Sequence, residues 1–318
     1  MGKRLKIFFH DNCFDGAASA AVFADFYQQT IDRDARIVLQ GVQHQQGDPF
    51  AGHAIDGDDN ACVDFRYNPG VSWWFDHHVS AFQPPSLRAD FEADQSGTKF
   101  YDPTARSNTK FQTDTLVERF GYQPPPGLAE VVRWADIIDS ARFESPAVAV
   151  GLAEPAMLLM TWLEANTDPE LTARFIRSLG HRTLAELARE PWITRVLEPL
   201  LERHRHNIEL IRARAVYDSG VVYFDLGDDG VSSFNKFISY FLYPEASYTI
   251  GLTNAAERVK VSVGSNPWAP ERRRHDIASI CERYGGGGHP VVGAVTLPAG
   301  DLDEARRISQ IIRAELAS

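Results

Sequence analysis

The chain has 318 residues, 44% of them hydrophobic and 24% charged, which is typical of a globular protein long enough for two domains. Its 32 basic and 43 acidic residues give a net charge of −11, which excludes a general electrostatic attraction for duplex nucleic acid. A phosphate-containing partner would therefore have to be captured locally. Three widely spaced cysteines, Cys13, Cys62 and Cys281, exclude a disulfide scaffold and a paired-cysteine zinc site.

The N-terminus starts with basic residues, but its apolar run is short, and no stretch approaches the ~20 apolar residues of a membrane span. We therefore expect no signal peptide, no membrane association and a cytoplasmic location. A reducing compartment agrees with the cysteine usage.

The first part of the chain alternates apolar runs with one clear helix. Residues 4–9 predict a buried strand, and 16–28 predict a helix whose small residues allow close packing on a sheet. Apolar runs at 36–42, 61–65 and 71–75 have the length of parallel-sheet strands. We expect an N-terminal α/β domain.

A helical stretch separates this domain from a second one. Residues 108–212 read as mostly helical, with one long helix at 193–212, and the domain boundary is expected at 205–215. Strands then follow at 221–226, 246–253, 257–263 and 291–297, with helices at 275–284 and 301–316. The predicted fold is α/β: a parallel-sheet domain over 1–205 that includes a helical connector, and a smaller α/β domain over 215–318.

Polar residues follow the ends of several predicted strands. They are the run His10-Asp11-Asn12-Cys13-Phe14-Asp15-Gly16, the carboxylate of Asp64, and the run Asp76-His77-His78. Because the carboxyl ends of parallel strands meet at one edge of a sheet, these side chains could converge. Carboxylates and imidazoles suit a divalent cation, and imidazole favours Mn²⁺ over Mg²⁺. Taken singly, a strand-end Asp is more often a helix cap, and paired histidines are more often structural.

In order and character, this set resembles the DHH phosphoesterase superfamily, which is named after its Asp-His-His motif. Three further segments support the resemblance. A helical stretch at 134–139 offers Asp136 as another metal-binding carboxylate, with Asp139 as the fallback, and Ser107 precedes a predicted helix. The run Gly285-Gly286-Gly287-Gly288-His289 is similar to the Gly-Gly-Gly-His motif of the family's associated C-terminal domain.

The resemblance implies a metal-dependent phosphoesterase that cleaves phosphoester or phosphoanhydride bonds with a metal-activated water. It implies one or two divalent ions, Mn²⁺ first, with Mg²⁺ or another transition metal as alternatives. The implied ligands are His10, Asp15, Asp64, His77 and Asp136, with Asp64 bridging, and Cys13 is a further candidate. Asp76 would be a ligand or would orient His77, and His78 would contact the phosphate or the leaving group.

Substrate contacts are implied for the remaining motif residues. These are Ser107, Gly286, Gly287, Gly288, His289, which is also a catalytic candidate, and Arg273. The alternative for Ser107 is a helix cap. Nucleotide binding would require stacking aromatics, for which Trp268, Tyr284 and Phe234 are candidates, although such residues are more often part of a core.

Two positions depart from the family pattern. Cys13 stands where an aspartate is expected, and a thiolate ligand would shift metal preference toward Mn²⁺, Zn²⁺ or Fe²⁺. Alternatively, Cys13 packs as a small hydrophobe, and Asp11 supplies the missing carboxylate. Gly264 stands where relatives often carry arginine, and Arg273 is the candidate replacement.

The expected substrates are short single-stranded oligonucleotides or linear dinucleotides. Cyclic dinucleotides are the nearest alternative, followed by polyphosphate or pyrophosphate. A non-enzymatic alternative is a nucleotide-binding regulatory protein with a degenerate site, motivated by Cys13 and Gly264. A homodimer is left open as the assembly.

Overall fold

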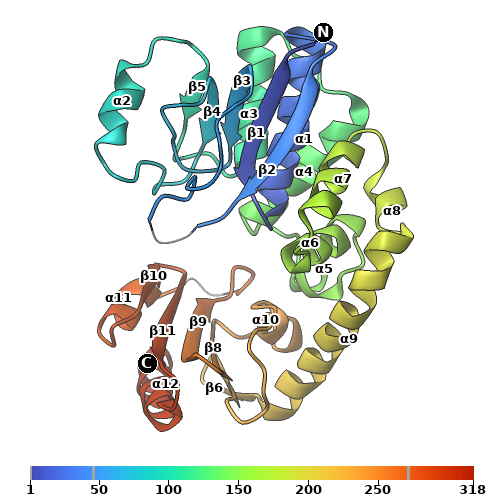
Figure 1. Ribbon diagram of the computed structural model, residues 1–318. Coiled ribbons are helices and arrows are strands. Elements are labelled where there is room, and N and C mark those ends of the chain that lie inside the picture. The colour runs from blue at the N-terminus through green and yellow to red at the C-terminus, as the bar shows by residue number, and fades with distance from the viewer. Residues whose placement is uncertain (1, 45–46, 271–272) are drawn as a thin grey trace. The chain divides into compact units, whose positions relative to one another are not determined.

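The computed structural model of the protein describes residues 2–44, 47–270 and 273–318 (Figure 1). The chain forms two compact units, the first made of Met1–Phe143 with Ala153–Leu197 and the second of Glu144–Leu152 with Glu198–Ser318. The division after Leu197 precedes the segment 205–215 where a boundary was expected. Residues 144–152 belong to the second unit because their carbonyls accept hydrogen bonds there, from His204 to Val150 at 2.7 Å and from Asn235 to Ala149 at 2.9 Å.

The first unit is built on a five-stranded, all-parallel sheet with the order β2-β1-β3-β4-β5. This confirms the predicted parallel sheet. Its strands are β1 (Arg4–His10), β2 (Arg36–Val42), β3 (Asp59–Val63), β4 (Trp73–Asp76) and β5 (Lys99–Tyr101). The strand predicted at 61–65 ends at Val63, so Asp64 lies just beyond it. The three-residue strand β5 is too short to give an apolar run and was not predicted.

Helix α1 (Phe14–Thr30) packs against β1, α3 (Asn108–Phe120) and α4 (Pro126–Asp139). Small side chains let it approach closely, and Gly16 is the extreme case, because a Cβ there would lie 2.1 Å from the His10 carbonyl oxygen. The start of α1 is therefore held directly against the end of β1. The other helices of this unit are α2 (Leu87–Ala93), α6 (Pro155–Ala165), α7 (Pro169–Ser178) and α8 (Leu184–Leu187).

An apolar cluster of the first unit includes Phe8 of β1, Cys62 of β3 and Trp74 of β4, together with Phe65 and Tyr67. Phe8, Cys62 and Trp74 are completely buried. Trp74 also donates its indole N–H to the Phe65 carbonyl at 2.9 Å, which holds the segment after β3 against β4. This packing fixes the backbone on either side of Asp64.

Helix α9 (Pro191–Arg214) begins in the first unit and ends in the second. It is 24 residues long, but charged residues recur along its whole length. In the part of the chain that the structure describes, no helix combines the length and the apolar character needed to cross a bilayer.

The second unit contains a six-stranded mixed sheet with the order β10-β11-β9-β8-β7-β6, in which β7 and β8 pair in parallel and the other neighbours pair antiparallel. Its strands are β6 (Val216–Asp218), β7 (Val221–Leu226), β8 (Tyr248–Ala255), β9 (Arg258–Ser265), β10 (Gly287–His289) and β11 (Val292–Pro298). Its helices, besides most of α9, are α5 (Pro146–Gly151), α10 (Ile238–Leu242), α11 (Ile277–Glu282) and α12 (Leu302–Leu316). The mixed α/β character predicted for this region is confirmed.

The glycine run forms part of a hairpin, in which β10 pairs with β11. A Cβ at Gly286 would lie 2.2 Å from the Ala294 carbonyl oxygen, and one at Gly288 would lie 2.2 Å from that of Val292. Gly288 also has a φ of +153°. The hairpin therefore requires glycine at these two positions for packing alone.

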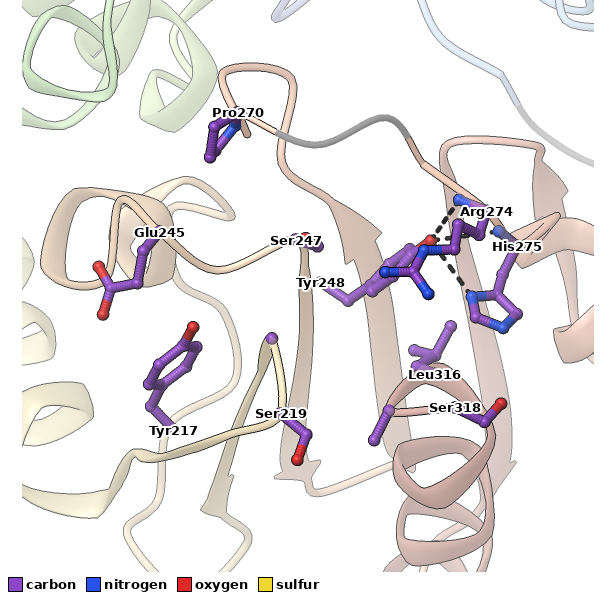
Figure 2. A pocket seen from close by; sticks show the side chains of 12 residues that line it. Tyr217, Ser219, Glu245, Ser247, Tyr248, Pro270, Arg274, His275, Leu316 and Ser318 are labelled. Atoms are coloured by element: carbon purple, nitrogen blue, oxygen red, sulfur yellow. Dashed lines mark hydrogen bonds between the residues drawn. The ribbon is translucent and has the colours of Figure 1, made fainter.

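A cavity of about 290 Å³ lies within the second unit (Figure 2). Tyr248 stands at its centre, and its hydroxyl accepts hydrogen bonds from the backbone amides of Arg274 at 2.8 Å and His275 at 3.1 Å. The residues that line it include none of the side chains singled out as ligands or substrate contacts. The candidate site therefore lies elsewhere.

Candidate metal centre

Three adjacent strands deliver the candidate ligands to one edge of the first sheet. His10 is the last residue of β1, Asp64 follows β3, and Asp76 is the last residue of β4 and leads into His77 and His78. Since β1, β3 and β4 are neighbours and parallel, their carboxyl ends coincide. The strand order reverses between β1 and β3, and such switch points are where open α/β sheets bind ligands.

The backbone turns sharply at Asp64. Its φ is +56°, a left-handed conformation that is uncommon for residues other than glycine and costs about 1–3 kcal/mol. Its amide still donates to the Phe75 carbonyl at 2.9 Å, so the residue stays tied to β4 while the side chain leaves the strand direction. The Asp64 side chain is only 1% exposed. A strained, buried carboxylate is thus held at the sheet edge.

His77 shows which of its ring nitrogens is available. Its Nδ1 donates to the Ala105 carbonyl at 3.1 Å, which leaves the lone pair on Nε2. That Nε2 lies 3.4 Å from Asp139 Oδ2, 3.6 Å from Asp64 Oδ1 and 3.9 Å from Asp15 Oδ2. An imidazole that is fixed by a backbone carbonyl through one nitrogen and faces carboxylates with the other is the arrangement of a metal-ligating histidine.

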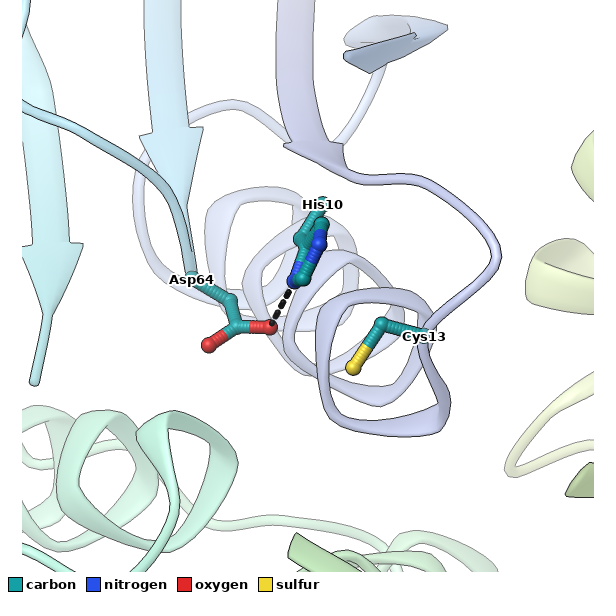
Figure 3. A group of neighbouring side chains, drawn as sticks. All are labelled: His10, Cys13 and Asp64. Carbon is teal, nitrogen blue, oxygen red and sulfur yellow. Dashed lines mark ion pairs between the residues drawn. The ribbon is translucent and has the colours of Figure 1, made fainter. Parts of the chain in front are cut away.

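The potential ligand atoms fall into three groups, in each of which they lie within 4.8 Å of one another. The first contains His10, Cys13 and Asp64 (Figure 3). The second contains Asp64, His77 and His78, and the third contains Asp15, His77 and Asp139. Asp64 and His77 each belong to two groups, so the donors form one continuous cluster. Two ligands about 2.1 Å from one ion stand about 3.0–3.4 Å apart, so contacts of 3.4–3.9 Å are near that spacing.

Several polar atoms of this cluster are buried without a hydrogen-bond partner among the described residues. They are His10 Nδ1, both carboxylate oxygens of Asp64, Asp76 Oδ2 and His77 Nε2. Leaving such atoms unpaired costs about 1–3 kcal/mol each in measured proteins. A divalent cation accepts electron pairs from all of these donor types. The donor set therefore fits a metal.

The electrostatics agree with this fit. Burial raises the pKa of Asp64 well above its ordinary value, and the carboxylates of Asp15 and Asp139 raise it further. Burial and the Asp15 carboxylate raise the pKa of Asp139 to about 7. Burial, together with the imidazoles of His44 and His78, lowers the pKa of His10 to about 4. The crowded, buried carboxylates therefore resist ionisation when no cation balances them, whereas a bound divalent cation would favour their charged forms, and His10 is already neutral, as a ligand must be.

Asp15 is oriented by the N-terminus of α3. Its two carboxylate oxygens accept hydrogen bonds from the amides of Asn108 at 2.6 Å and Thr109 at 3.0 Å. Ser107, predicted to contact substrate, is the N-cap of this helix: it is fully buried and its hydroxyl accepts from the Lys110 amide at 3.3 Å. This hydrogen bond is the helix cap offered as the alternative for Ser107, and the substrate contact assigned to it stays a prediction.

Asp76 orients His78, and its contact with His77 is through the backbone. Asp76 Oδ1 accepts from the His78 ring Nδ1 at 2.7 Å and from the His77 amide at 2.8 Å. The role predicted for Asp76, fixing the His77 ring, belongs to the Ala105 carbonyl instead. Burial lowers the pKa of His78, but the Asp76 carboxylate raises it more, so the pKa lies above its ordinary value.

Of the two carboxylates offered for α4, the structure brings Asp139, the fallback, close to the other donors. Asp139, three residues further along α4, contacts His77, whereas Asp136 is in none of the described donor groups. The last turn of α4 brings Asp139 to the sheet edge. Asp11, the other carboxylate considered, is in none of the described donor groups, and its side chain lies against Gly41 of β2, where an added Cβ would lie 2.6 Å from Asp11 Cγ.

The motif residues of the second unit show no comparable cluster among the described residues. His289 is exposed in β10, and Arg273 is exposed and donates to the His275 carbonyl. At Gly264, an added Cβ would lie 2.8 Å from the Tyr240 hydroxyl oxygen, so that hydroxyl occupies the space of a side chain. The substrate contacts assigned to Gly286, Gly287, Gly288, His289 and Arg273 remain predictions.

The three stacking candidates pack against other side chains of the second unit. Phe234 pairs with Phe224, Trp268 pairs with Phe237, and Tyr284 packs against the core beneath the sheet. All three are half-buried, so these contacts leave the predicted stacking on a nucleotide untested.

His44 belongs to the site but was not predicted. It follows β2, its ring centroid lies 4.9 Å from that of His10, and it stacks on Phe65 at 4.7 Å. Burial and then the Arg66 guanidinium lower the pKa of His44. The strand-end rule that selected His10 applies equally to His44 and would have found it.

The fold of this chain, with the donor cluster at one edge of its parallel sheet, is the fold of DHH-domain proteins. No protein-family model and no curated protein matches the sequence. Among solved structures, the chain is similar to the pGpG-specific phosphodiesterase PggH from Vibrio cholerae, with a TM-score of 0.70, 19% identity, and coverage of 98% of this chain and 99% of that one.

Two further structures share the fold. An exopolyphosphatase-related protein from Bacteroides fragilis gives a TM-score of 0.55 at 13% identity, covering 99% of this chain and 94% of the other. RecJ from Thermus thermophilus in complex with Mn²⁺ gives a TM-score of 0.57 at 14% identity, and the alignment covers 99% of this chain but only 52% of RecJ. The fold expected from the Asp-His-His resemblance is confirmed.

Proposed function

We propose that this protein is a metal-dependent phosphoesterase that hydrolyses linear dinucleotides or short single-stranded oligonucleotides. The observation that carries the proposal is the set of buried, unpartnered lone pairs on His10, Asp64 and His77 at the sheet edge. The DHH motif and the shared fold support the same chemistry. The RecJ structures, which hold Mn²⁺ or Mg²⁺, support a divalent cation.

The donor groups support the following roles for the site residues. His10, Asp15, Asp64, His77 and Asp139 would hold one or two divalent ions, and Asp64 would bridge because its Oδ2 faces His10 while its Oδ1 faces His77. When bound, such an ion lowers the pKa of a coordinated water and stabilises charge on the phosphoryl oxygens.

The chain's own residues position the substrate and the reacting groups. In the hydrolysis, the water oxygen bonds to phosphorus, and the bond to the leaving nucleoside oxygen breaks. His78 donates its Nδ1 hydrogen to Asp76, so Nε2 is the ring nitrogen that remains for a phosphoryl or leaving oxygen. The burial of Asp15 and Asp64 limits solvent around the acceptor carboxylates, which strengthens their electrostatic effect.

The proposed substrate class rests on the similarity to PggH. PggH aligns with nearly the whole of both chains, and its substrate pGpG is a linear dinucleotide. Polyphosphate is the second candidate substrate, because the chain also shares its fold with the exopolyphosphatase-related protein.

The test incubates the purified protein, with Mn²⁺ or Mg²⁺, with a linear dinucleotide, a short single-stranded RNA, a cyclic dinucleotide and polyphosphate. We expect the linear dinucleotide to be converted to mononucleotides fastest, followed by the RNA. His77→Ala should abolish turnover, while His204→Ala, which alters a histidine of α9, should keep it. If all four compounds stay intact while calorimetry shows bound metal, the enzyme assignment is wrong and a regulatory binding role replaces it.

A further inference from the structure

The donor groups on the two sides of Asp64 differ in chemical hardness. On one side, His10 and Cys13 offer nitrogen and sulfur, with His10 Nδ1 3.5 Å from Asp64 Oδ2. On the other side, His77 lies with the carboxylates of Asp15 and Asp139, which offer only nitrogen and oxygen. The two sides share the Asp64 carboxylate through its opposite oxygens.

Cys13 is well placed to act as a ligand. It is the N-cap residue of α1, and its side chain makes no capping hydrogen bond of the kind that Ser107 makes in α3. The close contact of Gly16 with His10 holds this end of the helix against β1. Figure 3 shows the Cys13 side chain beside those of His10 and Asp64, and its sulfur lies within 4.8 Å of a ligand atom of each.

The other two cysteines pack as buried side chains in apolar surroundings. Cys62 is completely buried in an apolar cluster, with its sulfur 3.7 Å from the Arg66 carbonyl oxygen. Cys281 is buried in the core of the second unit beneath Gly293. Cys13, in contrast, faces the unpartnered Nδ1 of His10 and the unpartnered oxygens of Asp64. A cysteine that only fills space would not need such neighbours.

We propose that His10, Cys13 and Asp64 form a thiolate-containing subsite for a thiophilic divalent ion such as Zn²⁺ or Fe²⁺, beside a harder subsite for Mn²⁺ or Mg²⁺ at Asp15, Asp64, His77 and Asp139. Sulfur and imidazole donors favour the softer ions, and carboxylate donors favour the harder ones. The inference rests on the proposed function, since it specifies the metal site of that same centre. The two positions of the centre then hold different ions.

The first test is the absorption spectrum of the metal-free full-length protein during titration with Co²⁺. A thiolate ligand gives an intense near-ultraviolet charge-transfer band that carboxylate and imidazole ligands do not give. We expect the band to saturate at one equivalent, to vanish in Cys13→Ser, and to persist in Cys281→Ser, a matched control. Visible cobalt bands without the charge-transfer band in the unaltered protein would overturn the inference, whatever the variants do.

The second test measures the ratio of bound Zn²⁺ to bound Mn²⁺ after dialysis against both ions. Cys13→Asp, which replaces thiolate by carboxylate, should lower that ratio by at least about 10-fold, because even partners that only orient ligands change metal affinity by about 10–100-fold. An unchanged ratio would contradict the thiolate subsite.

The two proposals fail in different ways. If the protein binds no divalent ion at all, the proposed function fails together with the subsite. If it binds ions and hydrolyses a dinucleotide but shows no thiolate band, only the thiolate subsite is wrong.

Discussion

The metal edge of the first sheet and the β10–β11 hairpin of the second both carry motif residues, but they differ in how well packing explains them. At the metal edge, Asp64 is buried and His77 half-buried, and both carry buried polar atoms that lack partners within the part of the chain that the structure describes. In the hairpin, Gly286 and Gly288 are required by contacts with the backbone of β11, and His289 is exposed. Packing explains why these two positions are glycine. Burying the Asp64 carboxylate without partners, in contrast, lowers the stability of the fold.

This difference separates two kinds of evidence for function. An unpartnered buried group has a free-energy cost that a ligand would remove, so the structure itself points to a ligand at the metal edge. The hairpin glycines have no such cost. Their role in substrate binding therefore depends on the resemblance and needs measurement.

The largest effect is expected from Asp139→Asn compared with Asp136→Asn. Asp139 contacts His77 and belongs to a donor group, so losing its charge should lower kcat/KM by at least about 10²-fold, the upper end for residues that only support ligands. Asp136→Asn on the same helix should change kcat/KM by less than that. Steady-state kinetics would measure this difference in kcat/KM between the two variants, and calorimetry would measure their metal binding. Equal losses in the two variants would remove Asp139 from the ligand set.

A smaller effect is expected from Gly288→Ala compared with Gly287→Ala. The added methyl group at Gly288 meets the Val292 carbonyl, and the backbone φ is unfavourable for alanine. The free energy of unfolding should therefore fall by about 1–3 kcal/mol. At Gly287 no atom lies within 4 Å of the new Cβ, and stability should change by less than about 0.5 kcal/mol. Urea unfolding of both variants measures this.

The same pair of variants can sharpen the contrast between the regions. A raised KM in Gly287→Ala at unchanged stability would show that the hairpin contacts the substrate as well as packing. Equal stability of the two alanine variants would show that the contact with Val292 does not constrain the hairpin.

The smallest effect is expected from Ser107→Ala. Losing the hydroxyl that accepts from the Lys110 amide should destabilise the protein by about 1 kcal/mol, and Ser107→Thr should restore most of it. Because Ser107 is fully buried, KM should not change in either variant. A higher KM with unaltered thermal stability would instead mean that Ser107 contacts the substrate.

The sequence allowed the first sheet to be predicted because buried parallel strands appear as apolar runs, as at 36–42, and because ligands follow strand ends. His10, Asp64 and His77 were found in this way. The sequence could not decide between Asp136 and Asp139 because both lie in one helical turn, where only side-chain direction determines which carboxylate reaches His77. Short strands such as β5 give no pattern, and hydrogen bonds to the α5 carbonyls come from residues more than fifty positions away.

The carbonyl that fixes the His77 ring belongs to the peptide of Ala105. Every amino acid supplies that same oxygen, so the side chain at position 105 can vary while the support of the ligand is kept. A mutational scan would then report tolerance at 105, and comparison of homologues would show drift there. Proline at 106 would be the informative exception, since it would restrict the backbone of 105 and redirect that oxygen.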